Sequence, residues 1–151
     1  MAKRKSETLK FVWELEAQKE DSALKVLAIA QKELSQHQAQ LQSLSSYRSQ
    51  YQSDLNAGMS QLQGTQPLMA AHHFFNQMSD AIEQQNLIVQ HAQVRCDQAK
   101  QQWALIHQKA TNLKSMYEDQ LRIEAAQDEK KEQSRLDDLY LAKRFRQSRG
   151  H

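Results

Sequence analysis

Mostly apolar residues recur every seven positions in the first part of the chain. One series consists of Leu27, Leu34, Leu41, Arg48, Leu55 and Leu62; a second series, offset by three, consists of Ala30, His37, Leu44 and Tyr51. Alternating steps of three and four residues place both series on one stripe of an α-helix. The frame weakens between Glu16 and Glu20. The pattern predicts a long amphipathic helix over about residues 6–58, with the stem of Arg48 along the stripe and its charged head in water.

A second heptad pattern, later in the chain, is more regular. Its two series are Phe75, Ile82, Val89, Cys96, Trp103, Ala110 and Tyr117, and Met78, Gln85, Ala92, Ala99, Ile106 and Leu113. Gln85 is the single polar residue among them. An apolar repeat of this kind, sustained over several heptads, is typical of a coiled coil. After Tyr117 the stripe fades into a charged run, so we predict a second helix over about residues 69–145 whose last part has no partner helix.

The segment between the two patterns, "NAGMSQLQGTQP", contains two of the three glycines and the only proline. Gly58 can adopt the left-handed conformation that ends a helix, and Pro67 suits the first turn of the next helix. We therefore predict a bend over about residues 56–68. A short connection between long helices favours antiparallel packing. The predicted fold is all-α: one coiled-coil domain over residues 1–151, an antiparallel two-helix hairpin with a C-terminal helical overhang.

A reversal centred on Gln63 also predicts the pairing of the two helices. Residue i should lie near residue 126 minus i. Trp13 should then face Leu113, and Tyr51 should face about Phe75. The second stripe weakens where the first helix runs out, which supports the hairpin.

Composition agrees with long helices that bury a narrow stripe. The 151 residues include 3 glycines and 1 proline, hydrophobic content is 39%, and the mean hydropathy is −0.85. No apolar run is long enough for a membrane span, and no apolar segment follows the basic start "MAKRKSETLKF", so we expect a cytoplasmic protein. The formal net charge of +2 gives no strong field that would favour nucleic acid.

Motifs for catalysis or cofactor binding do not occur. The sequence lacks GxxxxGK[ST], GxGxxG, HExxH, CxxC and GxSxG. We expect no enzyme activity, no cofactor and no metal site. Adjacent helical residues point about 100° apart, so His72 and His73 cannot easily share one metal ion. His37 and Cys96 lie in the heptad frame and are interpreted as seam residues.

Both ends of the chain are basic. These positions are Lys3, Arg4, Lys5, Lys143, Arg144, Arg146 and Arg149. In a hairpin both clusters lie toward the open end. They are either solvated tails or a cationic site for an acidic partner. Nucleic acid is the weaker candidate partner, because the helices carry no basic stripe and no stacking platform.

Aromatic residues near the bend form a wider stripe than two helices need. The stripe combines seam positions with one flank: Gln40, Leu44, Tyr47 and Tyr51 on the first helix, and Phe74, Met78, Ala81 and Gln85 on the second. Two helices cannot cover both flanks, so we expect Tyr47 and Phe74 to be exposed. An exposed aromatic patch with a polar rim marks a protein contact site. The alternative is a locally thicker core.

The chain resembles the flagellar export protein family FliJ over nearly its whole length. Two local motifs carry the resemblance: "LxxYxxxYxxxLNxxM", which begins at Leu44, and "FxxxMxxAIEQQ", which begins at Phe74. Met78 and Gln85 stand where better-known members have leucine and histidine. The related injectisome stalk proteins share the architecture and are the alternative within the same group. Outside the group, the alternatives are a dimerising or tethering coiled coil and a nucleic-acid-associated coiled coil.

The resemblance implies a function without an active site. Members of the family look like the central stalk subunit of rotary ATPases, place the end formed by both termini in the hexameric export ATPase, contact the membrane export-gate protein and escort export chaperones. The gate contact would comprise the eight stripe residues given above, and the basic ends would face the ATPase. The protein would then be cytoplasmic and peripherally associated with the inner membrane at the flagellar base, through its protein partners.

Overall fold

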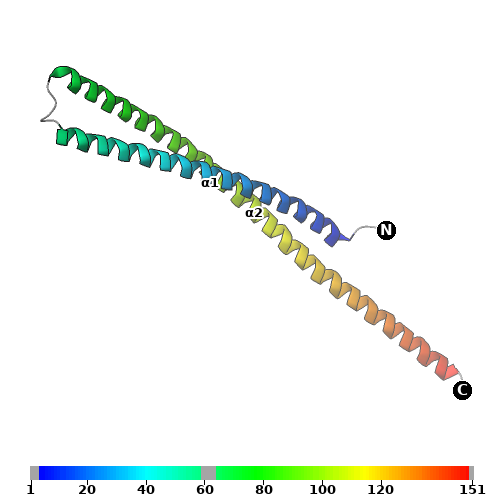
Figure 1. Ribbon diagram of the computed structural model, residues 1–151. Helices are drawn as coiled ribbons and strands as arrows, with labels where there is room; N and C mark the ends of the chain where they lie inside the picture. Colours follow the sequence, from blue (N-terminus) through cyan, green and yellow to red (C-terminus); the bar gives the residue numbers. More distant parts are fainter. Residues whose placement is uncertain (1–3, 59–63, 150–151) are drawn as a thin grey trace. The chain divides into compact units, whose positions relative to one another are not determined.

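The computed structural model describes residues 4–58 and 64–149, which form two long helices (Figure 1). Helix α1 spans Lys5–Gly58 and helix α2 spans Thr65–Arg149. No residue of the described ranges is in a strand. The predicted all-α class and the hairpin of two long helices are therefore confirmed. Helix α2 is longer than predicted, because it begins at Thr65 rather than at 69 and ends at Arg149 rather than at 145.

Local chemistry explains both ends of α2. Pro67 falls in the first turn, as predicted, where a helix needs no backbone N–H donor, so the helix can begin before the proline. At the other end, the guanidinium of Arg149 lies 4.8 Å from the ring centre of Phe145, one turn earlier. Basic side chains in the last turn also complement the helix dipole.

The glycines of the bend differ from the prediction. Gly58 was expected to adopt the left-handed conformation, but it remains the last residue of α1, and the positive φ of +94° is found at Gly64, directly before α2. Because this φ strains any residue with a Cβ, glycine is required at Gly64 rather than at Gly58. The centre of the predicted bend, residues 59–63, lies outside the described residues, and so do Leu62 and Met59.

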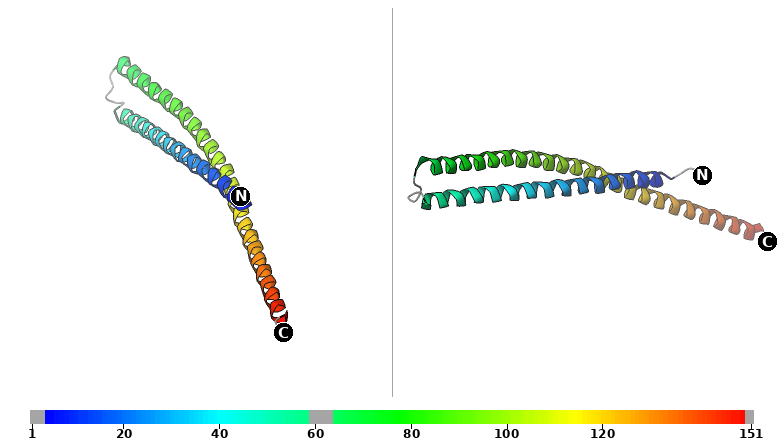
Figure 2. Two further views of the ribbon diagram at one scale, coloured as in Figure 1. Left: turned by 90° about the vertical axis from the view of Figure 1, so that its right-hand side faces the viewer. Right: turned by 45° about the horizontal axis from the view of Figure 1, so that its top comes forward.

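Contacts between the helices divide the chain into two compact units. The first unit comprises residues 1–20 and 105–151, and the second comprises residues 21–104. In each unit a segment of α1 packs antiparallel against a segment of α2. Both views of Figure 2 show this pairing for the second unit, where the cyan part of α1 runs beside the green part of α2.

The seam of the second unit is apolar and narrow. Its buried apolar residues are Leu27, Met78, Ile82, Ala92 and Cys96, and each occupies a predicted heptad position. No large side chain among the described residues is completely buried. Arg48 is half-buried; its Nη1 donates to Ser79 Oγ at 3.4 Å, and its guanidinium lies 5.9 Å from the ring centre of Phe75. The guanidinium of Arg48 therefore contacts the facing helix, whereas the sequence predicted that it would reach water.

The seam of the first unit is largely polar. Ser6, Glu16 and Glu124 are buried there, beside the buried Ala110. The Glu16 carboxylate lies between two lysines, at 3.2 Å from Lys19 Nζ and 3.3 Å from Lys109 Nζ. The hydrogen bond from Lys19 is the largest of the effects that hold the pKa of Glu16 below its usual range, and Lys109 adds to it. Desolvation of the carboxylate opposes both effects. The heptad frame weakens at this point because charged pairs replace apolar contacts.

The pairing of Trp13 is shifted by one helical turn from the prediction, whereas Glu16 contacts Lys109 within one residue of its predicted partner. Trp13 stacks on Tyr117 rather than on Leu113, with ring centres 5.8 Å apart and planes at 19°. The prediction that residue i faces residue 126 minus i assumes that both helices advance equally along one axis. In addition, helical side chains lean toward the N-terminus of their own helix. Large side chains on antiparallel helices therefore meet when their residue numbers add up to more than 126.

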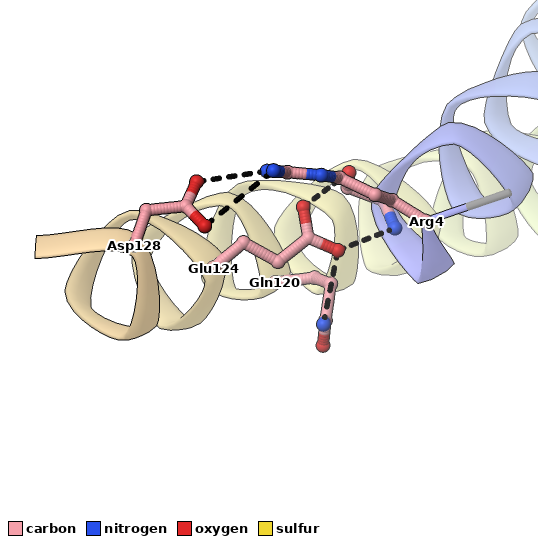
Figure 3. A network of polar contacts seen from close by, with 5 residues as sticks. Arg4, Gln120, Glu124 and Asp128 are labelled. Carbon is pink, nitrogen blue, oxygen red and sulfur yellow. Dashed lines mark hydrogen bonds and ion pairs between the residues drawn. The ribbon is translucent and has the colours of Figure 1, made fainter. Parts of the chain in front are cut away.

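A carboxylate of α2 caps the first turn of α1 (Figure 3). Glu124 accepts hydrogen bonds from the backbone N–H of Ser6 at 3.1 Å and from Ser6 Oγ at 2.5 Å. The first N–H groups of a helix have no partner within the helix, and negative charge is favoured beside them. Next to this cap, Arg4 binds both carboxylate oxygens of Asp128, at 2.9 and 3.4 Å.

Pairing therefore continues past Tyr117, where the apolar stripe ends. The first helix does not run out at Tyr117, where the apolar stripe weakens, because Ser6 and Arg4 still contact Glu124 and Asp128 through polar groups. The predicted overhang is present: the side chains of residues 129–149 are all exposed.

We expect the cap at the start of α1 to open in acid. The hydrogen bond from the Ser6 hydroxyl is the main cause that holds the pKa of Glu124 below its usual range, against desolvation. A carboxylate with a depressed folded-state pKa stabilises above its unfolded-state pKa, and this stabilisation disappears as the pH falls through the folded-state value. The NMR shift of the Ser6 amide proton should thus titrate with a midpoint below about 4.3, the usual glutamate value.

The substitution Glu124→Gln provides the control for this titration. It removes the titrating group and keeps its shape, so the acid transition of the Ser6 amide should vanish. A midpoint at or above the usual glutamate range, or a transition that persists in the variant, would contradict the assignment.

Candidate docking surfaces

The eight residues of the predicted gate-contact stripe all lie in the second unit, but the structure separates them by depth. Met78 and Gln85 are buried, with 9% and 5% of their surface exposed, and Leu44 and Tyr51 are half-buried. Gln40, Tyr47, Phe74 and Ala81 are exposed. We call these four exposed residues the aromatic edge. A partner that docks on the paired helices can touch the aromatic edge directly, whereas Met78 and Gln85 lie beneath it.

Tyr51 and Phe74 bring the two helices together at this edge. Their ring centres are 4.9 Å apart and their planes cross at 71°, an edge-to-face contact that aromatic pairs favour. The predicted partner of Tyr51 was Phe75, one residue away. Tyr47 lies one helical turn from Tyr51 on the same side of α1 and remains 58% exposed. Phe74 is 39% exposed although Tyr51 covers part of it.

The two flanks of the seam differ in polarity in this region. The aromatic edge occupies the heptad position before each residue of the Leu27 and Phe75 series. The positions of the opposite flank are polar: Gln31, Gln38, Ser45 and Gln52 on α1, and Ser79, Asn86 and Gln93 on α2. A two-helix coiled coil exposes both flanks of its seam, but only one flank is aromatic here. The exposure of Tyr47 and Phe74 is therefore specific to this flank.

An apolar hollow of about 470 Å³ adjoins the aromatic edge. Its lining includes Leu55 from the last turns of α1 and Leu68, Met69 and Phe75 from the first turns of α2. Met69 is 70% exposed. The heptad pattern did not indicate this hollow, although Leu55 lies in the first heptad series and Leu68 lies one heptad before Phe75. The missing information was the start of α2 at Thr65, which places Leu68 and Met69 on a helix.

The basic residues of the chain ends lie in the first unit and do not form one cluster. Lys3 lies outside the described residues. Arg4 is engaged with Asp128, whose hydrogen bond and charge raise the pKa of the guanidinium. Lys5, Lys143, Arg144, Arg146 and Arg149 are exposed. Since Lys143 is 15 positions beyond Asp128, it lies roughly 22 Å farther along α2.

The last turns of α2 combine this positive charge with apolar side chains. Tyr140 and Phe145 are 65% and 59% exposed, and Leu136, Leu139 and Leu141 are exposed beside them. In the overhang, then, cations and large apolar groups alternate around a helix without a partner helix. Such a surface suits an acidic partner that also offers apolar contacts.

Comparison with known protein families decides between the classes of coiled-coil protein that the sequence left open. A family model described as "Flagellar FliJ protein" matches residues 5–150, nearly the entire chain. The chain belongs to the FliJ family. No curated protein and no solved structure matches the chain. The FliJ family is a non-catalytic component of flagellar protein export, so this chain is a flagellar export-related protein.

Two further properties of this FliJ-family protein concern metal ligands and membrane-spanning segments. In residues 4–58 and 64–149, no three or more His, Cys, Asp or Glu side chains gather in a way that could hold a metal ion. Within the same ranges, neither helix offers a stretch sufficiently long and apolar to cross a bilayer. Cys96 is a free, buried thiol in the seam, as its heptad position indicates.

Proposed function

We propose that this FliJ-family protein is a non-enzymatic coupling protein of flagellar export, which binds the hexameric export ATPase and the membrane export-gate protein and escorts export chaperones. The observation that carries the proposal is the aromatic edge. Tyr47 and Phe74 come from different helices, are exposed together, and lie on the flank whose opposite side is polar. The protein would act in the cytoplasm and reach the membrane through the gate protein.

The gate protein is the proposed partner of the aromatic edge. Partly exposed tyrosine and phenylalanine side chains that rest on a rigid base are typical anchors of protein interfaces. Tyr51 supplies that base, because its ring packs against Phe74. Gln40 and Ala81 continue the same flank and provide a polar and a small neighbour. The adjoining hollow could accept an apolar side chain of the same partner.

The export ATPase is the proposed partner of the basic end of α2. Lys143, Arg144, Arg146 and Arg149 are exposed in the last turns of α2, together with Tyr140 and Phe145. Positive charge mainly raises the association rate and fixes orientation, while the apolar groups lower the dissociation rate. Because the two surfaces belong to different units of the fold, one chain can engage two partners without competition for the same residues.

Pull-down experiments with purified partners test the assignment of the two surfaces. The full chain should retain both the gate protein's cytoplasmic domain and the export ATPase. The variant Tyr47→Ala/Phe74→Ala should lose the gate protein and keep the ATPase, and the variant Arg144→Ala/Arg146→Ala should show the reverse. If either pair of substitutions affects both partners equally, or neither partner, the assignment is wrong.

A further inference from the structure

A buried amide joins the two helices directly beneath the aromatic edge. Gln85 is 5% exposed, and its Nε2 donates a hydrogen bond of 3.0 Å to the backbone oxygen of His37. It is the one polar residue in the predicted seam series of α2, and it meets the polar seam residue of α1 that separates Leu34 from Leu41. The side chain is therefore committed to the partner helix and does not face solvent.

Apolar contacts alone define the pairing of these helices poorly. The seam of the second unit consists of small or flexible groups such as Ala92, Cys96 and Met78, and no large side chain is completely buried in the described residues. A slip of one helical turn exchanges the two heptad series and still packs apolar residues against apolar residues. Polar groups at single seam positions are the usual means by which coiled coils exclude such alternatives, at some cost in stability.

Gln85 distinguishes the observed register from these slipped registers. A shift of α1 by one turn in either direction would carry the His37 oxygen about 5 Å along the helix axis, out of reach of the Gln85 amide. The amide would then lose the acceptor that it has in the observed register. A buried amide without a partner is costly, whereas the bond to a backbone oxygen fixes both the height and the rotation of α2 relative to α1.

We infer that Gln85 is a positioning residue, which holds α1 and α2 in the register that brings Tyr47 and Phe74 onto one edge, and that it does not itself touch the gate protein. The inference rests on the proposed function, since it assigns Gln85 a role beneath the docking surface. Arg48 supports the same register on the other side of the seam through Ser79 and Phe75.

The test compares the register of the full chain with that of its Gln85→Leu variant by thiol cross-linking. Both proteins carry Cys96→Ala. Gln38→Cys paired with Asn86→Cys reports the observed register, because these residues directly follow His37 and Gln85. Gln38→Cys paired with Gln90→Cys reports a slip of one turn. With a short bifunctional reagent, the parent should form the first cross-link preferentially, and Gln85→Leu should lower the ratio of the two rates about fivefold, the factor that corresponds to about 1 kcal/mol.

Two further measurements separate positioning from contact and from general stability. Gln85→Leu should keep the helix content and should not lower Tm, because an apolar residue replaces a buried polar group. Its affinity for the gate protein should nevertheless fall several-fold. The matched control Gln93→Leu, the same substitution at an exposed position of α2, should change neither the cross-linking ratio nor the affinity.

Each other outcome has a defined meaning. If Gln85→Leu weakens gate binding while the cross-linking ratio is unchanged, Gln85 is a contact and the inference fails. If the ratio changes and gate binding does not, the register is irrelevant to docking, and the inference also fails. If the parent does not bind the gate protein, the proposed function fails, whereas an altered ratio would still establish Gln85 as the residue that fixes the register.

Discussion

Replacing Tyr47 and Phe74 together by alanine should abolish measurable binding to the gate protein and should stop motility. Truncation of an aromatic anchor at the centre of an interface costs about 2 kcal/mol or more. Two such losses should weaken binding by at least about 100-fold. The fold should survive, because both side chains are exposed and alanine favours helices more than either aromatic residue.

Isothermal titration with the gate protein's cytoplasmic domain measures this effect, and circular dichroism verifies the helix content. Tyr140→Ala and Phe11→Ala are the matched controls, since both remove exposed aromatic side chains from the first unit. Either control should leave gate affinity within about twofold of the parent. Undiminished gate affinity in the Tyr47→Ala/Phe74→Ala variant would remove the aromatic edge from the proposal.

Introducing a carboxylate into the apolar seam should cause the largest loss of stability. Ala92 is 1% exposed, the most deeply buried residue among those that form the core. The substitution Ala92→Asp would bury a charge without a partner, at a cost of about 3 kcal/mol or more. For a chain of this length, the midpoint of thermal unfolding should fall by about 10 °C.

The pH dependence of that loss identifies its cause. Burial raises the pKa of a carboxyl group, so the introduced group becomes neutral in the folded chain as the pH falls. The difference in Tm between parent and variant should therefore shrink between pH 7 and pH 5. Ala104→Asp is the control, because Ala104 lies on the same helix and is exposed. A similar loss of Tm in both variants would indicate an effect of helix propensity rather than of the seam.

Heptad spacing was sufficient to predict the fold, because the stripe of a two-helix coiled coil is one-dimensional. Leu27, Ile82 and Ala92 are buried at the positions that the spacing assigns to them. The short polar segment with Gly58, Gly64 and Pro67 was sufficient to place the reversal. Exposure of Tyr47 and Phe74 also followed from the frame, since their positions lie beside the seam rather than in it.

Contacts that depend on polar side chains could not be predicted in the same way. The shift that pairs Trp13 with Tyr117, and the cap that Glu124 forms on Ser6, depend on where single donors and acceptors meet. A glutamate at a seam position weakens the apolar heptad pattern, so the pattern does not predict that it is buried. In the structure, Glu16 and Glu124 are buried and paired with polar groups of the facing helix. Likewise, the frame places Gln85 in the stripe but does not show that its amide is bound to His37.

The proposed coupling function requires one chain to engage the export ATPase and the gate protein at the same time. The most direct measurement is a bridging pull-down in which immobilised ATPase is incubated with the gate protein's cytoplasmic domain, with or without the full chain. We expect the gate protein to be retained only when the chain is present, and we expect Tyr47→Ala/Phe74→Ala to release the gate protein while the chain itself stays bound. Retention of the chain on the ATPase without recruitment of the gate protein, or mutual displacement of the two partners, would contradict it.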